Sequence, residues 1–242
     1  MNENTTVMNS DDAKIRFKDA VKLCARNKDC KTYNIQNIMN LKEPIAMVKA
    51  VNSSSQAQKC SSNRAGGLHN ATLICKGSKV MLLTNLWKEK GLTNGVNGVV
   101  KYIVYDQNIR PPELPAFVLV KFDQYTGPTF LPNEEKLIPI APIMRNWFQS
   151  NTQHTRTMIP LTPSYAITIH KSQGQTLDKI VLDIGDKEFA SGFTYTAISR
   201  AKKLEHVAFE TFPSYLIIRN IFHSVRFKNR VKEEERLKKL EL

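Results

Sequence analysis

The sequence predicts an α/β protein in which a parallel sheet with helices is interrupted by a small antiparallel β-barrel. Between residues 164 and 212, apolar strand-like runs alternate with helical stretches, which is typical of a parallel sheet. Between residues 77 and 145, short runs rich in Val, Ile and Phe are broken by Gly and Pro, which favours an antiparallel barrel. The length of 242 residues is enough for one large or two modest domains with real cores.

The N-terminal part of the chain is predicted to be mainly helical. Residues 10–27, SDDAKIRFKDAVKLCARN, have Ser10 as an N-cap, acidic residues in the first turn and apolar residues at near-helical spacing. A second helix is predicted over residues 32–41, TYNIQNIMNL. Residues 52–67, NSSSQAQKCSSNRAGG, are rich in Ser, Asn and Gly, and this composition predicts a flexible loop.

The middle of the chain carries most of the antiparallel signals. Asn94-Gly95 and Asn97-Gly98 stand in a polar connection between two apolar runs, and Asn-Gly supplies the positive φ angles that tight hairpin turns need. The predicted strands cover residues 79–86, 98–105, 117–122, 128–132 and 135–143.

The C-terminal part returns to alternating strands and helices. Strands are predicted at SYAITIH (164–170), KIVLDIG (179–185) and HVAFETF (206–212), with a helix in FASGFTYTAISRAKK (189–203) between the last two. The tail from Tyr215 to Leu242 is predicted to be a helix, with a charge-rich end that reads as a solvated face.

Charge is the unusual bulk property. The net charge of +13 favours polyanions, with nucleic acid first and an anionic membrane second. No apolar run approaches the roughly 20 residues of a spanning helix, and the polar, acidic N-terminus resembles neither a signal peptide nor a transit peptide. The four cysteines form no CxxC pair and have no histidine at finger-like spacing, so the sequence predicts isolated reduced thiols and no metal site.

A polar cluster follows the strand AITIH, where ligands gather in a parallel sheet. Thr168, His170, Lys171 and Ser172 can all donate hydrogen bonds to phosphate oxygens, and Gly174 lets a backbone approach closely. A helix beginning near Ser172 would add free N–H groups to this anion site. The alternative is an ordinary strand-to-helix turn with Ser172 as its N-cap.

A second candidate is the stretch FTYTAISRAKKLEHV, residues 193–207. On a helix, Thr196 and Arg200 lie one turn apart on the same face, with Lys203 one step further. The guanidinium of Arg200 matches phosphate geometry, although a single arginine on a helix is commonly a surface residue. The hypothesis gains weight because this helix follows the second strand of the same predicted sheet.

These two stretches carry a resemblance to a known family. ITIHKSQGQTLDKIVLDIG (167–185) and YTAISRAKKLEHV (195–207) resemble the fifth and sixth motifs of superfamily-one helicases, specifically the RecD-like group that includes the PIF-type DNA helicases. Residues 22–38, 73–103 and 156–170 also resemble segments of that family, so the resemblance covers nearly the whole chain. The stretch 52–67 and the final helix support it least.

The resemblance implies a RecA-like, P-loop NTPase-like second motor domain with an inserted small antiparallel β-barrel. The implied domains are 1–76, the first part of the motor domain with the flexible loop; 77–145, the barrel; 146–213, the remainder with the fifth and sixth motifs; and 214–242, a C-terminal helix.

The resemblance also implies site residues. Thr168, His170, Lys171 and Ser172 would lie against single-stranded DNA or in its supporting shell. Gln173, Gly174, Gln175 and Thr176 would face ATP. Arg200 matches the sixth-motif arginine, which acts as a finger on the γ-phosphate. In the barrel, Trp87, Lys88 and Lys90 are candidate DNA contacts, with exposed loop residues as the alternative.

One part of the family's machinery does not occur in these residues. No G-x-x-x-x-G-K-[ST] loop and no magnesium-binding Asp-Glu pair are found, and the resemblance assigns both, with ATP and Mg²⁺, to a first RecA-like motor domain. Positioning dominates phosphoryl transfer, so we expect no ATPase activity from this chain alone.

Two functions remain open at this point. The chain is either the C-terminal part of an ATP-dependent 5′–3′ DNA helicase or a non-catalytic single-stranded nucleic-acid-binding remnant of a helicase or mobile element. The resemblance implies an intracellular protein of the nucleus or mitochondrion, with roles in DNA repair and recombination and no membrane partner. Both the helicase hypothesis and its arginine finger require that Arg200 and residues 170–176 converge.

Overall fold

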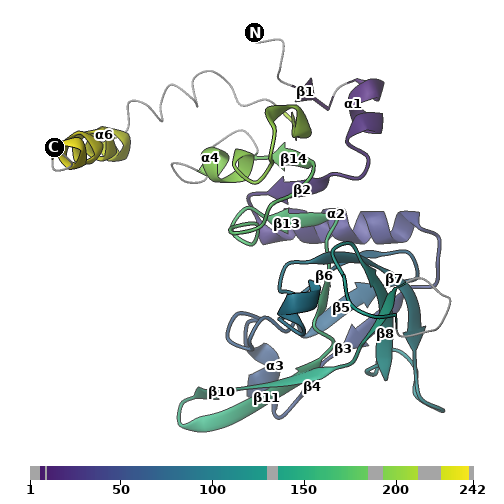
Figure 1. Cartoon of the computed structure of the whole chain (residues 1–242). Coiled ribbons are helices and arrows are strands. Elements are labelled where there is room, and N and C mark those ends of the chain that lie inside the picture. Colours follow the sequence, from purple (N-terminus) through teal and green to yellow (C-terminus); the bar gives the residue numbers. More distant parts are fainter. Residues whose placement is uncertain (1–5, 9, 130–135, 185–192, 212–224, 240–242) are drawn as a thin grey trace. The chain divides into compact units, whose positions relative to one another are not determined.

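The computed structural model describes residues 6–8, 10–129, 136–184, 193–211 and 225–239 (Figure 1). The chain forms two compact units, one made of residues 1–31 and 166–242 and the other of residues 32–165. The predicted insertion, 77–145, lies within the second unit. The finer domain boundaries stay a prediction.

The first unit contains a five-stranded sheet in which every neighbouring pair of strands is parallel. In spatial order the strands are β1 (Thr6–Val7), β15 (Val207–Phe209), β14 (Ile180–Asp183), β2 (Val21–Cys24) and β13 (Ala166–Thr168). The predicted parallel α/β sheet is therefore confirmed. Strands β2, β13, β14 and β15 are buried over almost their whole length, which explains their mainly apolar residues.

The helix predicted over residues 10–27 is wrong in its second half. Helix α1 (Asp11–Arg16) begins after Ser10, whose hydroxyl accepts from the N–H of Ala13 as predicted, but it ends at Arg16. Strand β2 then lies inside the parallel sheet, between β14 and β13. A strand of only four residues that is mostly buried cannot be distinguished from a helical segment by its periodicity.

Helix α2 (Asn27–Asn40) confirms the predicted second helix and begins earlier than expected. It carries the chain from the first unit into the second, because the boundary between the units falls after Lys31. At the far end of the chain, α6 (Val225–Lys238) confirms part of the predicted tail helix. Residues 212–224 and 240–242 of that prediction lie outside the described residues.

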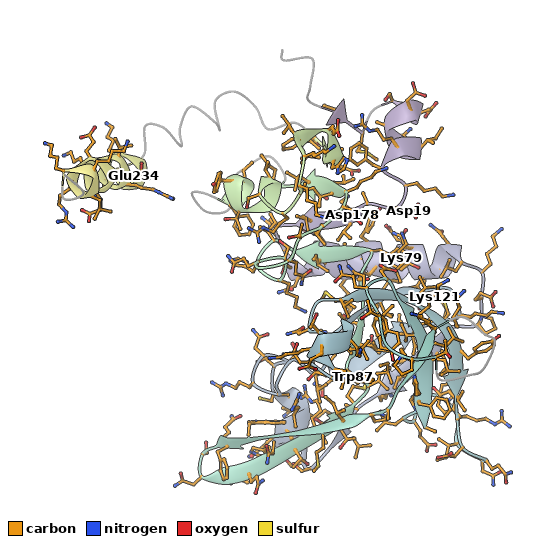
Figure 2. All side chains as sticks on the ribbon, viewed as in Figure 1. Asp19, Lys79, Trp87, Lys121, Asp178 and Glu234 are labelled. Atoms are coloured by element: carbon orange, nitrogen blue, oxygen red, sulfur yellow. The ribbon has the colours of Figure 1, made fainter. Side chains whose placement is uncertain are left out.

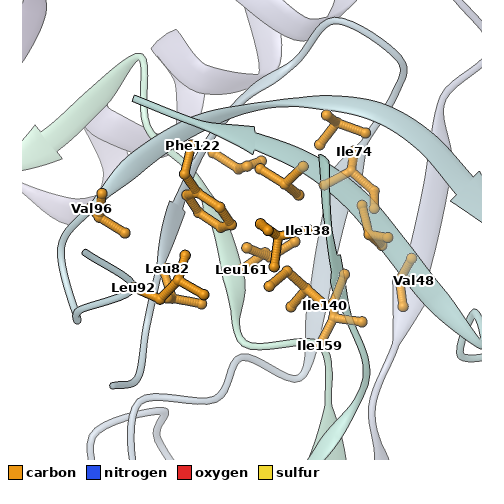
Figure 3. Close-up of a cluster of buried hydrophobic side chains, with 14 of the residues drawn as sticks. Val48, Ile74, Leu82, Leu92, Val96, Phe122, Ile138, Ile140, Ile159 and Leu161 are labelled. Carbon is orange, nitrogen blue, oxygen red and sulfur yellow. The ribbon is translucent and has the colours of Figure 1, made fainter. Parts of the chain in front are cut away.

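The second unit contains a five-stranded antiparallel sheet, as predicted for the middle of the chain. In spatial order it consists of β12 (Leu161–Pro163), β6 (Lys79–Leu82), β7 (Asn97–Val104), β8 (Phe117–Phe122) and β9 (Leu137–Ile140). Its buried face forms the core of the unit, with Leu82, Phe122 and Ile138 among its members (Figure 3). Each such side chain stabilises the fold by about 1.5–3 kcal/mol relative to exposure. Most of the strand predicted at 128–132 lies outside the described residues.

The two Asn-Gly pairs of this region behave differently. Gly95 has a φ of 95°, as a turn residue in the connection between β6 and β7, which also holds the short 3-10 helix η1 (Lys88–Lys90). Gly98 instead lies inside β7, so the turn prediction is wrong there. A Cβ at Gly98 would come within 2.6 Å of the Lys121 carbonyl oxygen, so close strand packing explains this glycine.

Smaller sheets complete the second unit. Strands β10 (Ile143–Gln149), β11 (Thr152–Met158) and β4 (Val51–Asn52) form one antiparallel sheet, and β3 (Ala46–Lys49) pairs with β5 (Ala71–Ile74) in another. The prediction of a plain flexible loop over 52–67 is wrong in part. This stretch contains helix α3 (Ser55–Lys59), whose N-cap Ser54 accepts from the N–H of Ala57.

A buried arginine holds this stretch in place. Arg156 of β11 has no exposed surface, and its guanidinium donates four hydrogen bonds at 2.7 to 3.0 Å. The acceptors are the carbonyl oxygens of Ala57, Cys60 and Leu68 and the Oδ1 atom of Asn52. A residue about a hundred positions away thus orders a segment that its composition marks as a loop.

Among the described residues, no helix has both the length and the apolar character to cross a membrane.

Candidate functional site

The candidate site begins where β13 ends, at Thr168. Residues 169–174 form consecutive turns, so no helix begins at Ser172 and the N-cap alternative is also wrong. The N–H of Ser172 donates to the carbonyl oxygens of Thr168 at 3.1 Å and Ile169 at 3.2 Å. Its hydroxyl donates to the Ile169 carbonyl at 2.8 Å. The hydrogen bonds of fully buried Ser172 therefore hold the turn together from within.

The predicted residues divide into a buried and an exposed set. Thr168 and Ser172 are buried, and Gln175 is half-buried with its Nε2 atom donating to the Lys171 carbonyl at 2.9 Å. The exposed residues are His170, Lys171, Gln173, Gly174 and Thr176. Only this second set is accessible from the surface, while the buried set supports the turn.

The backbone conformation at position 174 favours a glycine, whereas close packing does not require one. Its φ is +76°, and a Cβ placed on it would meet no atom within 4 Å. The left-handed conformation costs a side-chain-bearing residue about 1–2 kcal/mol. Gly174 therefore lets the turn reverse and leaves its outer surface open.

Arg200 lies just after helix α4 (Phe193–Ile198). Its Nε donates to the Thr196 carbonyl at 3.0 Å, and one terminal nitrogen donates to Ser199 Oγ at 2.9 Å. The predicted proximity of Thr196 and Arg200 is thus present, although the helix ends before Arg200. These contacts hold the partly exposed guanidinium while leaving part of its planar donor set for an anion.

Two contacts bring the polar turn and the arginine segment together. The N–H of Leu177 donates to the Arg200 carbonyl at 2.9 Å, and Leu177 forms a parallel bridge with Ala201. Earlier in each segment, the rings of His170 and Phe193 meet edge to face with centroids 4.9 Å apart. The two segments therefore lie side by side in the first unit. The convergence of the Arg200 guanidinium itself with residues 170–176 stays a prediction.

Lys171 carries the positive charge of the turn. Loss of water around its ammonium lowers the pKa of Lys171 below its ordinary value, and the nearby Cys30 partly offsets this by raising it. A cation at the end of β13 suits a phosphate.

The edge of the sheet also holds a charged cluster that the sequence analysis missed. Lys22 of β2 is 8% exposed, and its Nζ lies 3.0 Å from Asp183 Oδ2 and 3.3 Å from Glu210 Oε2. The sequence did contain a signal for this cluster. A lysine stands inside one mainly apolar strand, and acidic residues stand at the ends of two other strands. Burial alone would lower the pKa of Lys22, but the hydrogen bond and charge of Asp183, with Glu210, raise it.

Replacing Lys22 with methionine should destabilise the first unit by about 1–2 kcal/mol, because two carboxylates lose their cation. The expected loss is moderate because the Asp183 and Glu210 side chains keep 34% and 46% of their surface exposed, so water screens them. Urea denaturation monitored by circular dichroism measures the difference. Lys14→Met, which removes an exposed ion pair with Asp11, is the matched control.

The pH dependence of this difference has a definite sign. The pKa of Lys22 is raised on folding, so its stabilising effect is fully present below the unfolded value of about 10.4. It is lost only as the pH rises through the still higher folded value. The gap between wild type and Lys22→Met should therefore stay constant from pH 7 to about pH 10 and shrink above it. A gap that shrinks between pH 7 and about pH 9 would contradict this assignment.

In the second unit, Trp87 is 42% exposed and precedes the 3-10 helix that carries Lys88 and Lys90 (Figure 2). Trp87 and Leu92 exchange backbone hydrogen bonds at 3.1 and 2.9 Å, and these bonds fix the backbone of the residue that carries the indole ring. An exposed indole that is followed by Lys88 and Lys90 is a suitable surface for stacking a base.

Comparisons with known proteins agree with this geometry. The chain is 26% identical to "ATP-dependent DNA helicase PIF1" of Xenopus laevis over 228 residues, 92% of the chain and 32% of that relative. It is 33% identical to "ATP-dependent DNA helicase PIF6" of Trypanosoma brucei brucei over 136 residues, 56% of the chain and 16% of that relative. It is 26% identical to "ATP-dependent DNA helicase Pif1" of Campylobacter jejuni over 76% of the chain and 40% of that relative. No protein-family model matches the chain.

Solved structures show the same fold. The Pif1 helicase of Candida albicans superimposes with a TM-score of 0.63 at 21% identity, covering 87% of this chain and 53% of that one. The Bacteroides Pif1 helicase in complex with ADP-AlF3 and single-stranded DNA gives a TM-score of 0.59 at 23% identity, covering 89% and 46%. The chain thus spans less than half of each relative above and about half of each solved chain.

Proposed function

Because the chain is a homologue of the PIF1-type DNA helicases, we propose that it is the C-terminal portion of an ATP-dependent 5′–3′ DNA helicase. In this proposal it binds single-stranded DNA and supplies Arg200 to an ATP site shared with a first motor domain. The observation that carries the proposal is the backbone hydrogen bond between Leu177 and Arg200, which joins the polar turn to the arginine segment.

On the DNA side, His170 and Lys171 are the exposed donors of the turn. Buried Thr168 and Ser172 shape it, since the Thr168 hydroxyl accepts from the Lys171 N–H at 3.4 Å and the Ser172 hydroxyl bonds within the turn. Phosphate contacts of this kind hold a strand without reading its sequence. Trp87, Lys88 and Lys90 add a second basic and aromatic surface on the other unit.

On the ATP side, residues 173–176 present Gln173, the open backbone at Gly174 and Thr176 beside the segment that carries Arg200. We propose that the Arg200 guanidinium donates to the γ-phosphate and stabilises the negative charge that develops on it. Mg²⁺ would neutralise phosphate charge when ATP is bound, and none of the residues named here is proposed as its ligand. Among the described residues, no group of three or more His, Cys, Asp or Glu side chains could hold a metal ion.

DNA repair, DNA recombination and a nuclear or mitochondrial site belong to the same proposal. The competing proposal is a non-catalytic module that holds single-stranded nucleic acid. It is favoured by the net charge of +13 and by the lack of a G-x-x-x-x-G-K-[ST] loop in these 242 residues. A reading frame for that loop directly upstream of this sequence in the genome would favour the helicase.

Replacing Lys171 with alanine should weaken binding of a fluorescein-labelled dT oligonucleotide by about three- to tenfold at low salt, because one phosphate contact is lost. It should also reduce the slope of log affinity against log salt by about 0.7. Fluorescence anisotropy across a salt series measures both quantities.

Lys18→Ala is the control, because Lys18 is an exposed lysine of the same unit outside the site. Its affinity and slope should match those of wild type. A salt-independent affinity of the wild-type chain would contradict the nucleic-acid assignment of residues 168–172.

A further inference from the structure

Strand β10 (Ile143–Gln149) has a free edge. In its three-stranded sheet the spatial order is β10, β11 and β4, so within the described part of the chain β10 has a neighbouring strand on one side only (Figure 1). All seven residues of β10 pair with β11 in one continuous register. Edge strands are commonly protected by a proline, a lysine or a bulge that prevents further pairing, and β10 has none of these. Its edge is therefore open to another strand.

The directions of the backbone groups along this edge follow from the hydrogen bonds of β11. The N–H of Ser53 donates to the Thr155 carbonyl oxygen at 3.1 Å, and the Thr155 N–H donates to Ser53 Oγ at 2.9 Å. Both backbone groups of Thr155 therefore point toward the β4 side of the sheet. Because hydrogen-bonded and non-hydrogen-bonded pairs alternate in an antiparallel ladder, Asn146 opposite Thr155 points its N–H and C=O away from β11. The same holds for Met144 and Phe148, two residues to either side.

Exposed apolar side chains border these backbone groups. Fully buried Arg156 marks the inner face of β11, so Thr157, the next residue, lies on the outer face. Met144 and Val51 both stand opposite Thr157, so the three side chains form one row across the outer face. Met144, Phe148 and Val51 are 64%, 76% and 62% exposed. An added strand would cover Met144 and Phe148 with every second one of its side chains.

The elements around this edge carry basic residues and no acidic ones. Residues 44–88 and 136–177, which include β4, β10, β11 and the segment 54–68, contain no Asp or Glu. Arg145 lies on the inner face of β10, and the segment 54–68 packs against it, because a Cβ on Gly66 would come within 3.1 Å of its Cγ. The exposed bases of the hairpin and the segment are Lys59, Arg64 and Arg145. An acidic side chain placed beside Arg145 would therefore meet no acidic group of these elements.

We propose that the edge of β10 binds an extended segment of a partner protein in which acidic and apolar residues alternate. The backbone of that segment would pair with the free N–H and C=O groups of Met144, Asn146 and Phe148, as an added strand of the sheet. Its apolar side chains would lie beside Met144 and Phe148 on the outer face, and its acidic side chains beside Arg145 on the inner face. The inference does not require that the chain binds DNA or ATP.

Two other occupants fit the edge less well. Two copies of β10 paired antiparallel about Asn146 would bring their Arg145 side chains onto one face as diagonal neighbours, in chains that each carry a net charge of +13. A nucleic-acid strand would match the positive charge, but it has no regular ladder of N–H and C=O groups to pair with the edge. The acidic and apolar partner segment satisfies both the backbone groups and the charge.

Fluorescence anisotropy with the full 242-residue chain tests the proposal. The probe is a fluorescein-labelled peptide of alternating valine and glutamate with the length of β10. It should bind at least about tenfold more tightly than a peptide of alternating valine and lysine, and Arg145→Met should reduce this preference. Methylation of the backbone nitrogens keeps the charge of the peptide and removes its ladder donors, so it should weaken binding at least about tenfold.

Asn146→Pro tests the ladder from the side of the protein. The Asn146 N–H points away from β11, so proline should leave the hairpin folded, as circular dichroism would show, and block the middle of the edge. Binding of the valine–glutamate peptide should fall at least about tenfold. The double variant Met144→Thr, Phe148→Thr keeps strand propensity but removes the apolar side chains, and should weaken binding about three- to tenfold. Tyr102→Thr, which changes an exposed residue of β7 in another sheet, is the control and should bind as wild type.

The proposal is overturned if the valine–glutamate peptide does not bind, or if its N-methylated form binds equally well, because charge alone would then explain the binding. Loss of dT oligonucleotide affinity in Asn146→Pro without any effect on peptide binding would assign the edge to nucleic acid instead. A wild-type dimer that Asn146→Pro converts to a monomer in sedimentation would assign it to a second copy of the chain. The peptide comparisons use the wild-type chain, so they decide the question even if Asn146→Pro unfolds.

Discussion

Replacing Arg156 with methionine should destabilise the second unit by about 3–5 kcal/mol, the largest stability loss that we expect from a single substitution in this chain. The guanidinium is fully buried and has no carboxylate partner among the described residues, so desolvation lowers the pKa of Arg156. Its charge is balanced by the four acceptors in residues 52–68 and by the face of Trp147, whose ring centre lies 5.7 Å away.

The sign of this effect follows from which groups remain after the substitution. Methionine removes a buried charge, which by itself is favourable. The carbonyl oxygens of Ala57, Cys60 and Leu68 cannot be removed with it, and each buried acceptor left without a donor costs about 1–3 kcal/mol. Three such acceptors outweigh the gain, so the segment 54–68 should open even where the antiparallel sheet survives.

Limited proteolysis measures this opening directly. Trypsin sites at Lys59 and Arg64 lie within the segment. If the substitution lowers the free energy of local opening by about 3 kcal/mol, the variant should be cut there about a hundredfold faster than wild type. Arg145→Met is the matched control, because Arg145 pairs with Arg156 across β10 and β11 but is exposed. It donates one hydrogen bond to Thr84 Oγ1 at 2.7 Å, and its loss should cost about 1 kcal/mol or less. Equal cleavage rates for the two variants would refute the anchoring role of Arg156.

Arg156 also shows why the sequence predicts some parts of this fold and not others. Composition correctly places Gly66 and Gly67 in a turn region, with φ of 61° and 89°. It predicts no helix α3, because that helix depends on a capping serine and on an arginine from a distant strand. The parallel sheet was predictable because β13, β14 and β15 are apolar runs of strand length with polar ends. Strand β2 was not, because its four residues continue the helical spacing of Ile15 and Ala20.

The candidate site divides in the same way. Donor-rich side chains after a strand identified the turn at 168–176, since strand ends collect ligands in parallel sheets. Burial then separated Ser172 from His170, and no local pattern predicts that difference. The contact between Leu177 and Arg200 is a backbone hydrogen bond, so side-chain chemistry gives no sign of it. From the sequence, it was the resemblance to helicase motifs that assigned the two segments to one site.

Arg200→Ala should reduce ATP turnover by about a thousandfold or more when the chain is joined to a first motor domain of a PIF1-type relative. The chain alone should show no turnover, because Arg200 is proposed to supply only the finger and no G-x-x-x-x-G-K-[ST] loop occurs in these 242 residues. A thousandfold loss corresponds to about 4 kcal/mol of transition-state stabilisation, which is the size expected for a charge aimed at a transferring phosphoryl group. Steady-state ATPase assays with saturating dT oligonucleotide measure it. The relative's own second domain in the same fusion is the positive control.

Matched variants distinguish a finger from a structural arginine. Arg200→Lys keeps the charge but loses the planar donor pair, so it should recover only a small part of the lost rate. Lys202→Ala, an exposed cation two residues away, should leave turnover unchanged. Oligonucleotide affinity should stay within about twofold of wild type in all three variants, because we propose the phosphate contacts of the strand for Lys171 and not for Arg200. In the part of the chain that the structure describes, the Arg200 side chain bonds to Thr196 and Ser199 of its own segment, while its backbone carbonyl holds Leu177. Alanine removes the guanidinium and keeps that carbonyl, so the turn should stay in place.

A thousandfold loss of turnover with DNA binding intact would therefore report the chemistry of the guanidinium itself. Unchanged turnover in Arg200→Ala would instead favour the non-catalytic binding module.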